Sequence, residues 1–150
     1  MERQFKIRAA TIRDLDQLCE LAGQLLMQIH AEGTVSDARR VLERTLQSST
    51  AGLVVVAEHN GTLCGYAYAA YEWRAEFKGE TMDIVALFVG DQWRSKGVGR
   101  SLVAAVIEIA RERGIRRISA QVHPGNAAIE RTLESSGFDP ERRTLWGLRL

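Results

Sequence analysis

Hydrophobic positions in the first third of the chain recur every three or four residues, which is the spacing of an amphipathic helix. This pattern predicts a helix over residues 12–29, and the pair Thr11 and Asp14 fits a capping box at its start. A weaker pattern over residues 34–46 predicts a second helix. Residues 5–8 alternate between polar and apolar and indicate a short strand before both helices.

The middle of the chain is rich in β-branched and aromatic residues, which favour strands. Residues 53–58 and 62–73 flank the pair Asn60-Gly61, so we expect two antiparallel strands joined by a tight hairpin. A third run, at 81–89, is apolar at nearly every position from its fourth residue on, which indicates a strand buried on both faces. Helices are therefore expected on both sides of the sheet.

The second half of the chain alternates helix and strand. Residues 97–113 place apolar side chains at helical spacing and are followed by Gly114, a typical helix terminator. A strand at 115–122 and a helix at 126–136 follow, and one or two closing strands are expected within 138–150. A strand, a helix and a strand in this order form a right-handed crossover with parallel strands.

The predicted class is mixed α/β, with a central sheet of six or seven strands and about four helices in one domain, 1–150. A net charge of +1 gives no overall field that would attract nucleic acid or an anionic membrane. Without an apolar signal core or membrane span, a cytoplasmic location is expected. Cys19 and Cys64 lie in apolar contexts without metal-type spacing, so we expect buried reduced thiols and no metal.

The turn before the helix at 97–113 combines glycine with positive charge. Gly97 and Gly99 lie beside Arg94, Lys96 and Arg100, with no acidic residue between the first and last of these cations. Free N–H groups at a helix N-terminus attract anions, and glycine lets a phosphate approach the backbone. The segment therefore favours a polyanionic ligand, although a solvated basic turn that caps a helix is the simpler alternative.

Two other nucleotide motifs do not fit this turn. A P-loop requires Gly-Lys followed by Ser or Thr, whereas the order here is Ser95-Lys96-Gly97. A dinucleotide fingerprint requires glycine or alanine where this chain has Leu102, and it normally lies in the first crossover of the sheet.

The sequence R-S-K-G-V-G at residues 94–99 resembles the acyl-CoA signature Q/R-x-x-G-x-G/A of the GNAT N-acetyltransferase family. Residues 87–89 resemble the strand that precedes this signature, and Asn126 with Gly137-Phe138 resembles the final helix and its end. The resemblance implies a fold in which the fourth and fifth strands splay apart, so that acetyl-CoA enters between them. It also implies transfer of an acetyl group to a primary amine.

The resemblance assigns cofactor contacts to individual residues. The pyrophosphate is expected to bind the amides of the signature turn. The pantetheine is expected to lie beside the backbone of the preceding strand, and the outer arm of the cofactor beside Asn126. A backbone amide near Phe88 or Val89 is expected to polarise the thioester oxygen. The cofactor-binding residues implied are Leu87, Phe88, Val89, Arg94, Ser95, Lys96, Gly97, Val98, Gly99, Arg100, Ser101 and Asn126.

Direct attack by an amine requires a base, because an amine with a pKa of about 10.4 is almost entirely protonated at neutral pH. Asp83 is our candidate, since it lies among apolar residues and matches the position of the basic glutamate in the histone acetyltransferase branch. A strand-end carboxylate paired with an arginine is the alternative for Asp83. A water relay, His123, and the acidic residues Glu72, Glu76 and Glu80 are further candidates.

Leu133 departs from the family pattern, because many members carry a tyrosine four residues before the Gly-Phe pair. A leucine cannot protonate the departing sulfur, so water is left to do so. A CoA-binding sensor or interaction module without catalysis therefore stays open as an alternative. A second alternative is acetylation of a protein N-terminus or lysine rather than a small amine. Exposed closing strands favour a homodimer.

Overall fold

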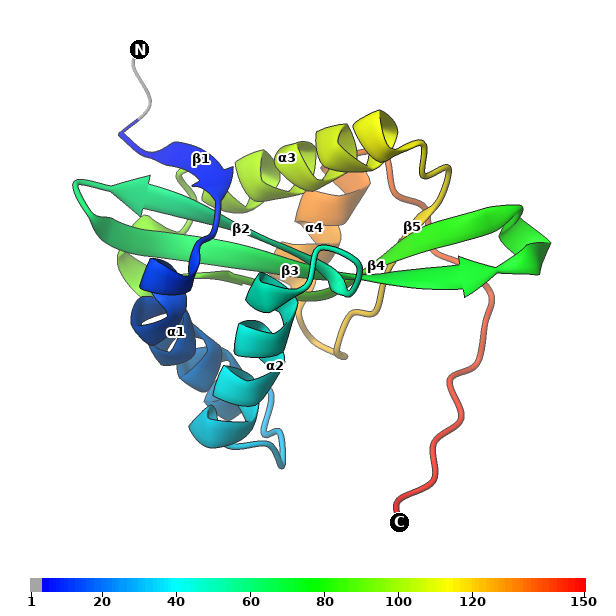
Figure 1. Cartoon of the computed structure of the whole chain (residues 1–150), viewed down its shortest axis with the longest axis horizontal. Coiled ribbons are helices and arrows are strands. Elements are labelled where there is room, and N and C mark those ends of the chain that lie inside the picture. Colours follow the sequence, from blue (N-terminus) through cyan, green and yellow to red (C-terminus); the bar gives the residue numbers. More distant parts are fainter. Residues whose placement is uncertain (1–3) are drawn as a thin grey trace.

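A mixed five-stranded sheet runs through the molecule in the order β1-β2-β3-β4-β5 (Figure 1). The computed structural model describes residues 4–150. The first four strands pair antiparallel with their neighbours, whereas β5 pairs parallel with β4. The strands are β1 Lys6–Ala9, β2 Gly52–His59, β3 Thr62–Arg74, β4 Gly79–Val89 and β5 Ile118–Ala120.

Helices cover both faces of the sheet, as the apolar strand pattern predicted (Figure 1). The helices α1 (Leu15–Gln28) and α2 (Val35–Gln47) pack on one face, and α3 (Val98–Arg113) and α4 (Ala127–Ser135) pack on the other. Within residues 4–150, no helix combines the length and the apolarity needed to cross a bilayer.

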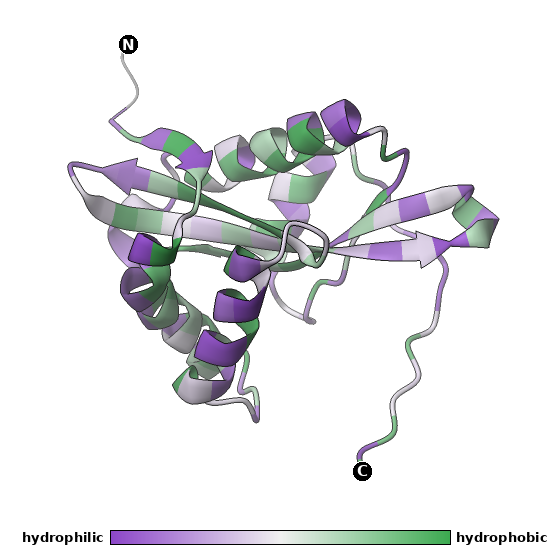
Figure 2. Cartoon of the chain, in the orientation of Figure 1, coloured by the Kyte–Doolittle hydropathy of each residue, from purple (hydrophilic) through white to green (hydrophobic). Residues whose placement is uncertain are grey.

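The strand β2 shows how one sheet serves two cores. Val54 and Val56 pack with α1 and α2, whereas Val55 and Ala57 pack in the cluster formed with α3 and α4. Successive side chains of a strand point to opposite faces, so a run of small apolar residues fills both cores. In Figure 2 the strands are largely hydrophobic where they cross the middle of the molecule, and hydrophilic residues gather on the outer turns of the helices.

Local signals in the sequence are confirmed where they depend on few residues. Asn60 and Gly61 have φ angles of 48° and 82°, which are the left-handed values that a two-residue hairpin turn requires. Gly114 ends α3 with a φ of 81°. Cys19 and Cys64 are both buried and unpaired, as expected.

The closing strands predicted within 138–150 are wrong, and the sheet has five strands rather than six or seven. In the described chain these residues form no strand, and Leu145, Trp146 and Leu148 are 77%, 88% and 85% exposed. A strand needs a neighbour to complete its backbone hydrogen bonds, and an apolar composition does not supply one. The strand expected at 115–122 is also shorter, because β5 pairs over three residues alone.

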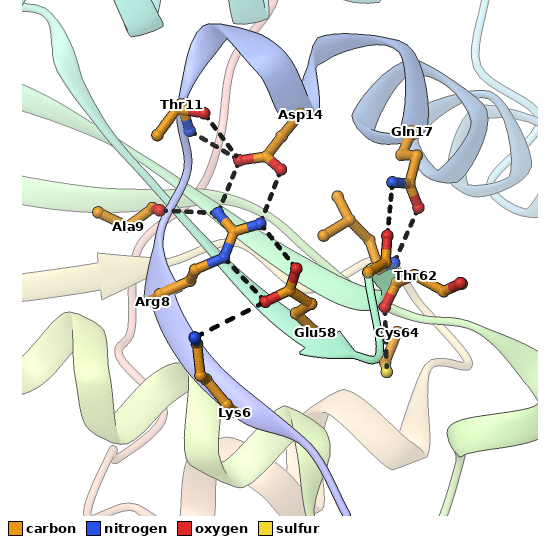
Figure 3. A network of polar contacts seen from close by, with 11 residues as sticks. Lys6, Arg8, Ala9, Thr11, Asp14, Gln17, Glu58, Thr62 and Cys64 are labelled. Atoms are coloured by element: carbon orange, nitrogen blue, oxygen red, sulfur yellow. Dashed lines mark hydrogen bonds and ion pairs between the residues drawn. The ribbon is translucent and has the colours of Figure 1, made fainter.

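A polar network fastens β1, β2 and the start of α1 together (Figure 3). Arg8 donates two hydrogen bonds of 2.8 Å to the buried carboxylate of Asp14 and also pairs with Glu58 at 3.2 Å. The Arg8 guanidinium lowers the pKa of Asp14. The backbone N–H of Thr11 donates to the same carboxylate, so this group both caps the helical turn and anchors the strand.

Candidate active site

The strands β4 and β5 part after three paired residues. Their parallel register runs from Met82 opposite Ile118 to Ile84 opposite Ala120. Beyond this point β5 ends, whereas β4 continues to Val89. An unpaired edge of β4 is therefore exposed from residue 85 onward, and a wedge opens between the two strands.

A β-bulge lies at the vertex of this wedge. Tyr68 of β3 pairs with Ala86, and the next residue, Ala69, pairs with Ile84. Val85 is thus left without a partner on β3, and its side chain is 54% exposed. Because a bulge bends the strand that carries it, β4 turns away where β5 ends.

Side chains line a cleft at this wedge, between the helices on the two faces of the sheet. Leu25 of α1 and Ile29, which follows α1, line it on one side of the sheet, and Ile129 and Leu133 of α4 line it on the other. Its remaining lining residues come from the edges of the two strands and the turn after β5: Ile84, Val85, Ala86, Leu87, Ala120, Gln121, Val122, His123 and Asn126.

The backbone of β4 presents alternate residues to the cleft. Gly90 donates its N–H to the carbonyl of Cys64 at 2.8 Å, so Gly90 points toward β3. Strand alternation then directs Phe88 toward β3 and directs Leu87 and Val89 toward the open edge. Of the two amides predicted to polarise a thioester, the one at Val89 lies on the cleft side, whereas the one at Phe88 faces β3.

The N-terminus of α3 has the properties of an anion site. Gly97 is the residue before the helix, with a φ of 82°, and the first turn contains no acidic residue. The first N–H groups of a helix lack partners within it, and they carry partial positive charge. Two N–H groups of the predicted loop already have partners: that of Arg94 donates to the carbonyl of Asp91 at 3.5 Å, and that of Ser101 donates to the carbonyl of Gly97 at 3.0 Å.

Gly99 lies where this helix end approaches its neighbours. A Cβ at Gly99 would stand 3.7 Å from Val89 and 3.8 Å from Thr132, so the position faces β4 and α4 at ordinary contact distance. A methyl group fits here, whereas a longer side chain would fill the space beside the free amides. Val98, between the two glycines, is buried and holds the turn against the sheet.

The three cations of the turn differ in their contacts. Arg94 reaches the open edge of β4, where its Nε donates to the carbonyl of Val89 at 3.4 Å, and it also contacts Gln28 of α1 at 3.3 Å. Lys96 lies over the ring of Trp93, 5.1 Å from its centre. Arg100 is exposed in the first turn of α3, and Ser95 is exposed with a left-handed φ of 62°.

Asn126 caps α4 and lines the cleft. Its side-chain oxygen accepts a hydrogen bond of 3.3 Å from the N–H of Ile129. The structure thus gives Asn126 a local role, and its position on the cleft wall also suits contact with a bound molecule.

Asp83 lies one residue before the vertex of the wedge and is half-buried. Its Oδ1 accepts a hydrogen bond of 2.9 Å from the hydroxyl of Ser119 on β5. Burial raises the pKa of Asp83, the bond from Ser119 lowers it, and the nearby charge of Glu72 raises it further. A carboxyl group with a raised pKa close to a cleft is a candidate proton acceptor.

The other candidate bases are placed differently. Arg74 pairs with both Glu72 and Glu76, at 2.8 and 3.4 Å. Glu80 pairs with Arg113 at 2.7 Å. His123 lines the cleft from the turn after β5, and the buried Leu133 faces it without a proton to donate.

Three residues of the site were not predicted: Ser119, Leu25 in α1, and Ile29, which follows α1. Ser119 could have been found from the register of the parallel strands, because it pairs directly with Asp83. The positions of Leu25 and Ile29 depend on how α1 packs across the sheet, which local sequence does not encode.

The description "Acetyltransferase (GNAT) family" belongs to a family model that matches residues 15–138. The chain belongs to the GNAT acetyltransferase family. The matched range begins with α1 and ends at Phe138, so it contains the wedge, the turn before α3 and α4. This membership confirms the resemblance that the signature at 94–99 indicated.

Two curated GNAT relatives match at moderate identity. A mycothiol acetyltransferase of Propionibacterium freudenreichii is 30% identical over 128 residues, which cover 83% of this chain and 40% of the relative. An L-methionine sulfoximine/L-methionine sulfone acetyltransferase of Salmonella typhimurium is 35% identical over 86 residues, which cover 57% of this chain and 49% of the relative. The chain therefore matches less than half the length of each of these relatives.

Solved structures share the fold over almost the whole chain. An aminoglycoside N-acetyltransferase, AAC(6')-Iy in complex with CoA, superposes with a TM-score of 0.84 at 20% identity and covers 99% of this chain and 97% of its own. An integron cassette protein from a salt-marsh metagenome has a TM-score of 0.85 at 20% identity, covering 96% and 90%. At these identities the likeness shows the fold alone.

Proposed function

We propose that this GNAT domain transfers an acetyl group from acetyl-CoA to a primary amine by direct attack of the amine on the thioester. One observation carries the proposal: the open edge of β4 leads to the free N-terminus of α3. An extended amide chain can pair with the strand edge, while a diphosphate binds the helix end. Acetyl-CoA has both parts in this order, because its pantetheine arm is joined directly to its diphosphate.

The backbone and the loop cations hold the ligand in this proposal. The diphosphate binds the amides of residues 97–100, where Arg94 and Arg100 add positive charge. The pantetheine pairs with Leu87 and Val89 at the open edge, and Asn126 faces the outer arm. A metal ion has no part in this scheme.

The cleft walls prepare the reaction. The acetyl thioester supplies the group to be transferred when it is bound. Of the amides at the open edge, that of Leu87 lines the cleft and lies nearer to Asp83 than that of Val89, so it is placed to hydrogen-bond the thioester oxygen as negative charge develops on it. Apolar side chains from α1 and α4 exclude water and strengthen this bond, because electrostatic interactions are stronger in a medium of low dielectric constant.

Asp83 removes the proton from the incoming amine. At an ordinary pKa of about 10.4, only about one amine in 2,500 is neutral at pH 7. A base that accepts this proton directly or through one water increases the reactive fraction. The sulfur needs less help, because a thiol with a pKa of about 8.5 leaves readily as a thiolate, and water protonates it. Leu133 is therefore compatible with turnover.

Replacement of Gly99 by leucine tests the cofactor site. The longer side chain would enter the space between β4, α4 and the helix end, and we expect the affinity for acetyl-CoA to fall at least about tenfold. Gly147→Leu is the matched control, since Gly147 has no neighbouring atom within 4 Å. Calorimetric titration measures both affinities. Equal binding by wild type and a folded Gly99→Leu variant would refute the loop assignment.

The alternative is a CoA-binding module without catalysis, which Leu133 favours because it removes the expected acid. Release of free thiol from acetyl-CoA in the presence of amines separates the two functions. Peptides with a free N-terminus or a lysine belong in the same assay, because acetylation of a protein is the second alternative. Binding of acetyl-CoA without amine-dependent thiol release identifies the module.

A homodimer is the assembly that we propose. The C-terminal residues Leu145, Trp146 and Leu148 are largely exposed, and exposed apolar segments of this kind commonly mark protein contacts. Light scattering on the protein at two concentrations tests this, and truncation after residue 143 is expected to abolish the dimer.

A further inference from the structure

The acidic side chains on the same face as Asp83 are neutralised by arginine. Glu72 lies two positions along β3 from Ala70, the partner of Asp83, so alternation places it on the face of Asp83. The guanidinium of Arg74 binds Glu72 at 2.8 Å and Glu76 at 3.4 Å. One arginine thus holds both the carboxylate of Glu72 on β3 and that of Glu76 on the following turn.

Two further acidic residues are paired with arginine in the same way. Glu32, after α1, pairs with Arg149 at 2.9 Å. Glu141 pairs with Arg117 at the start of β5 and with Arg143 at 3.4 Å. These four glutamates are thus matched by arginine charge, which weakens their attraction for a polycation.

Asp83 differs from Glu72 and Glu76. Within residues 4–150 it makes no ion pair, and its hydrogen-bond partner is the neutral hydroxyl of Ser119. The carboxylate of Asp83, at the vertex of the wedge, can therefore pair with one protonated amine.

The surface next to that carboxylate is apolar. Leu25 of α1 and Ile29, just after that helix, line the cleft. The bulged Val85 also lines it and is 54% exposed. Exposed apolar side chains inside a cleft favour an apolar part of a ligand.

We infer that the acceptor is a compact primary amine with one positive charge and an apolar body, and not a polycation. This inference rests on the proposed acetyl transfer. A polycation would need several carboxylates, and Glu72 and Glu76 would first have to release Arg74. A monoamine needs Asp83 alone for its charge and packs its body against the α1 side of the cleft.

Competing amines test the inference directly. The first pair of probes is 2-phenylethylamine and L-leucinamide, each with one amine and an apolar body, and the second is spermine and kanamycin, which are polycations. We expect kcat/KM from thiol release to be at least about tenfold higher for the monoamines. Higher values for the polycations would overturn the inference and leave the acetyl transfer intact.

A charge variant gives a second test, in which the same two amines are compared between wild type and variant. Arg74→Gln frees Glu72 and Glu76, so it is expected to raise the ratio of kcat/KM for spermine to that for 2-phenylethylamine about tenfold. Arg113→Gln is the matched control, because its partner Glu80 lies on the opposite face of β4 and the ratio should stay unchanged. An unchanged ratio in Arg74→Gln contradicts the inference.

Failure of the proposed function has a different signature. If no amine releases thiol although acetyl-CoA binds, the transfer itself is refuted and the acceptor inference falls with it. If all four amines react, acetyl transfer is supported, and the ratios of kcat/KM between monoamines and polycations then decide the class of acceptor.

Discussion

The hydroxyl of Ser119 donates a hydrogen bond of 2.9 Å to Oδ1 of Asp83 across the parallel strands β5 and β4, one residue before those strands part. Two opposing influences therefore meet at one carboxyl group. Burial raises the pKa of Asp83, and the hydrogen bond from Ser119 holds it down. This balance sets the pH at which Asp83 becomes a base.

Ser119→Ala is predicted to move the acidic limb of the kcat/KM profile to higher pH. The variant loses the hydrogen bond that favours the ionised carboxyl group, so the pKa of Asp83 rises and less of the base is available at neutral pH. Ser119→Thr keeps a hydroxyl and should restore the wild-type profile. A lower kcat/KM at every pH, with the limb unmoved, would indicate a purely structural role for Ser119.

Asp83→Asn is predicted to lower kcat by a factor of about 10² to 10⁴, because the amide cannot accept the proton. The same variant is predicted to be more stable. The folded pKa of Asp83 is raised, so ionised Asp83 lowers the free energy of unfolding once the pH rises through that pKa. The gain should therefore be present at mildly alkaline pH and vanish in acid, which urea unfolding at both pH values measures. A variant that keeps its kcat removes Asp83 from the mechanism.

Gly97 and Gly61 form a matched pair for the anion site. Both have a φ of 82°, and at neither position would a Cβ meet an atom within 4 Å. Replacement by alanine should cost each protein a similar amount of stability, about 1 kcal/mol, because the backbone strain is the same. Gly97→Ala alone should also weaken acetyl-CoA binding, since Gly97 shapes the turn before α3. Equal affinities for both variants in calorimetric titration would contradict the proposed site.

The sequence allowed prediction of the elements whose signals are local. The hairpin at Asn60-Gly61 and the end of α3 at Gly114 depend on the backbone freedom of one or two residues, and both are found where expected. The crossover between β4 and β5 follows from the order of elements, and it too is confirmed.

The features that escaped prediction depend on distant partners. Residues 145–150 contain four large apolar side chains, but no neighbouring strand completes their backbone hydrogen bonds, so no strand forms in this part of the described chain. The bulge at Val85 could not be predicted, because residues 84–89 are apolar on both faces of the strand. A bulge moves the following side chains to the opposite face, and in such a run this does not alter the hydrophobic pattern.

Asp14 and Asp37 occupy the same position in two capping boxes but differ in burial. Each carboxylate accepts a hydrogen bond from the backbone of the preceding cap residue, at 2.7 Å from Thr11 and 2.8 Å from Thr34. Asp14 is buried against Arg8, whereas the side chain of Asp37 is 43% exposed. Their replacement by asparagine therefore separates the effect of the cap from that of the ion pair.

Asp14→Asn is predicted to lower the free energy of unfolding by about 2 kcal/mol at neutral pH, because it leaves the guanidinium of Arg8 with one carboxylate fewer. Asp37→Asn should cost less, since water solvates its surroundings. The pKa of Asp14 is lowered in the folded protein, so its contribution is complete above its unfolded pKa of about 3.9 and is lost as the pH falls through the folded value. Urea unfolding of wild type and Asp14→Asn should thus converge in acid, and a difference that persists there would mean that shape rather than charge stabilises this corner.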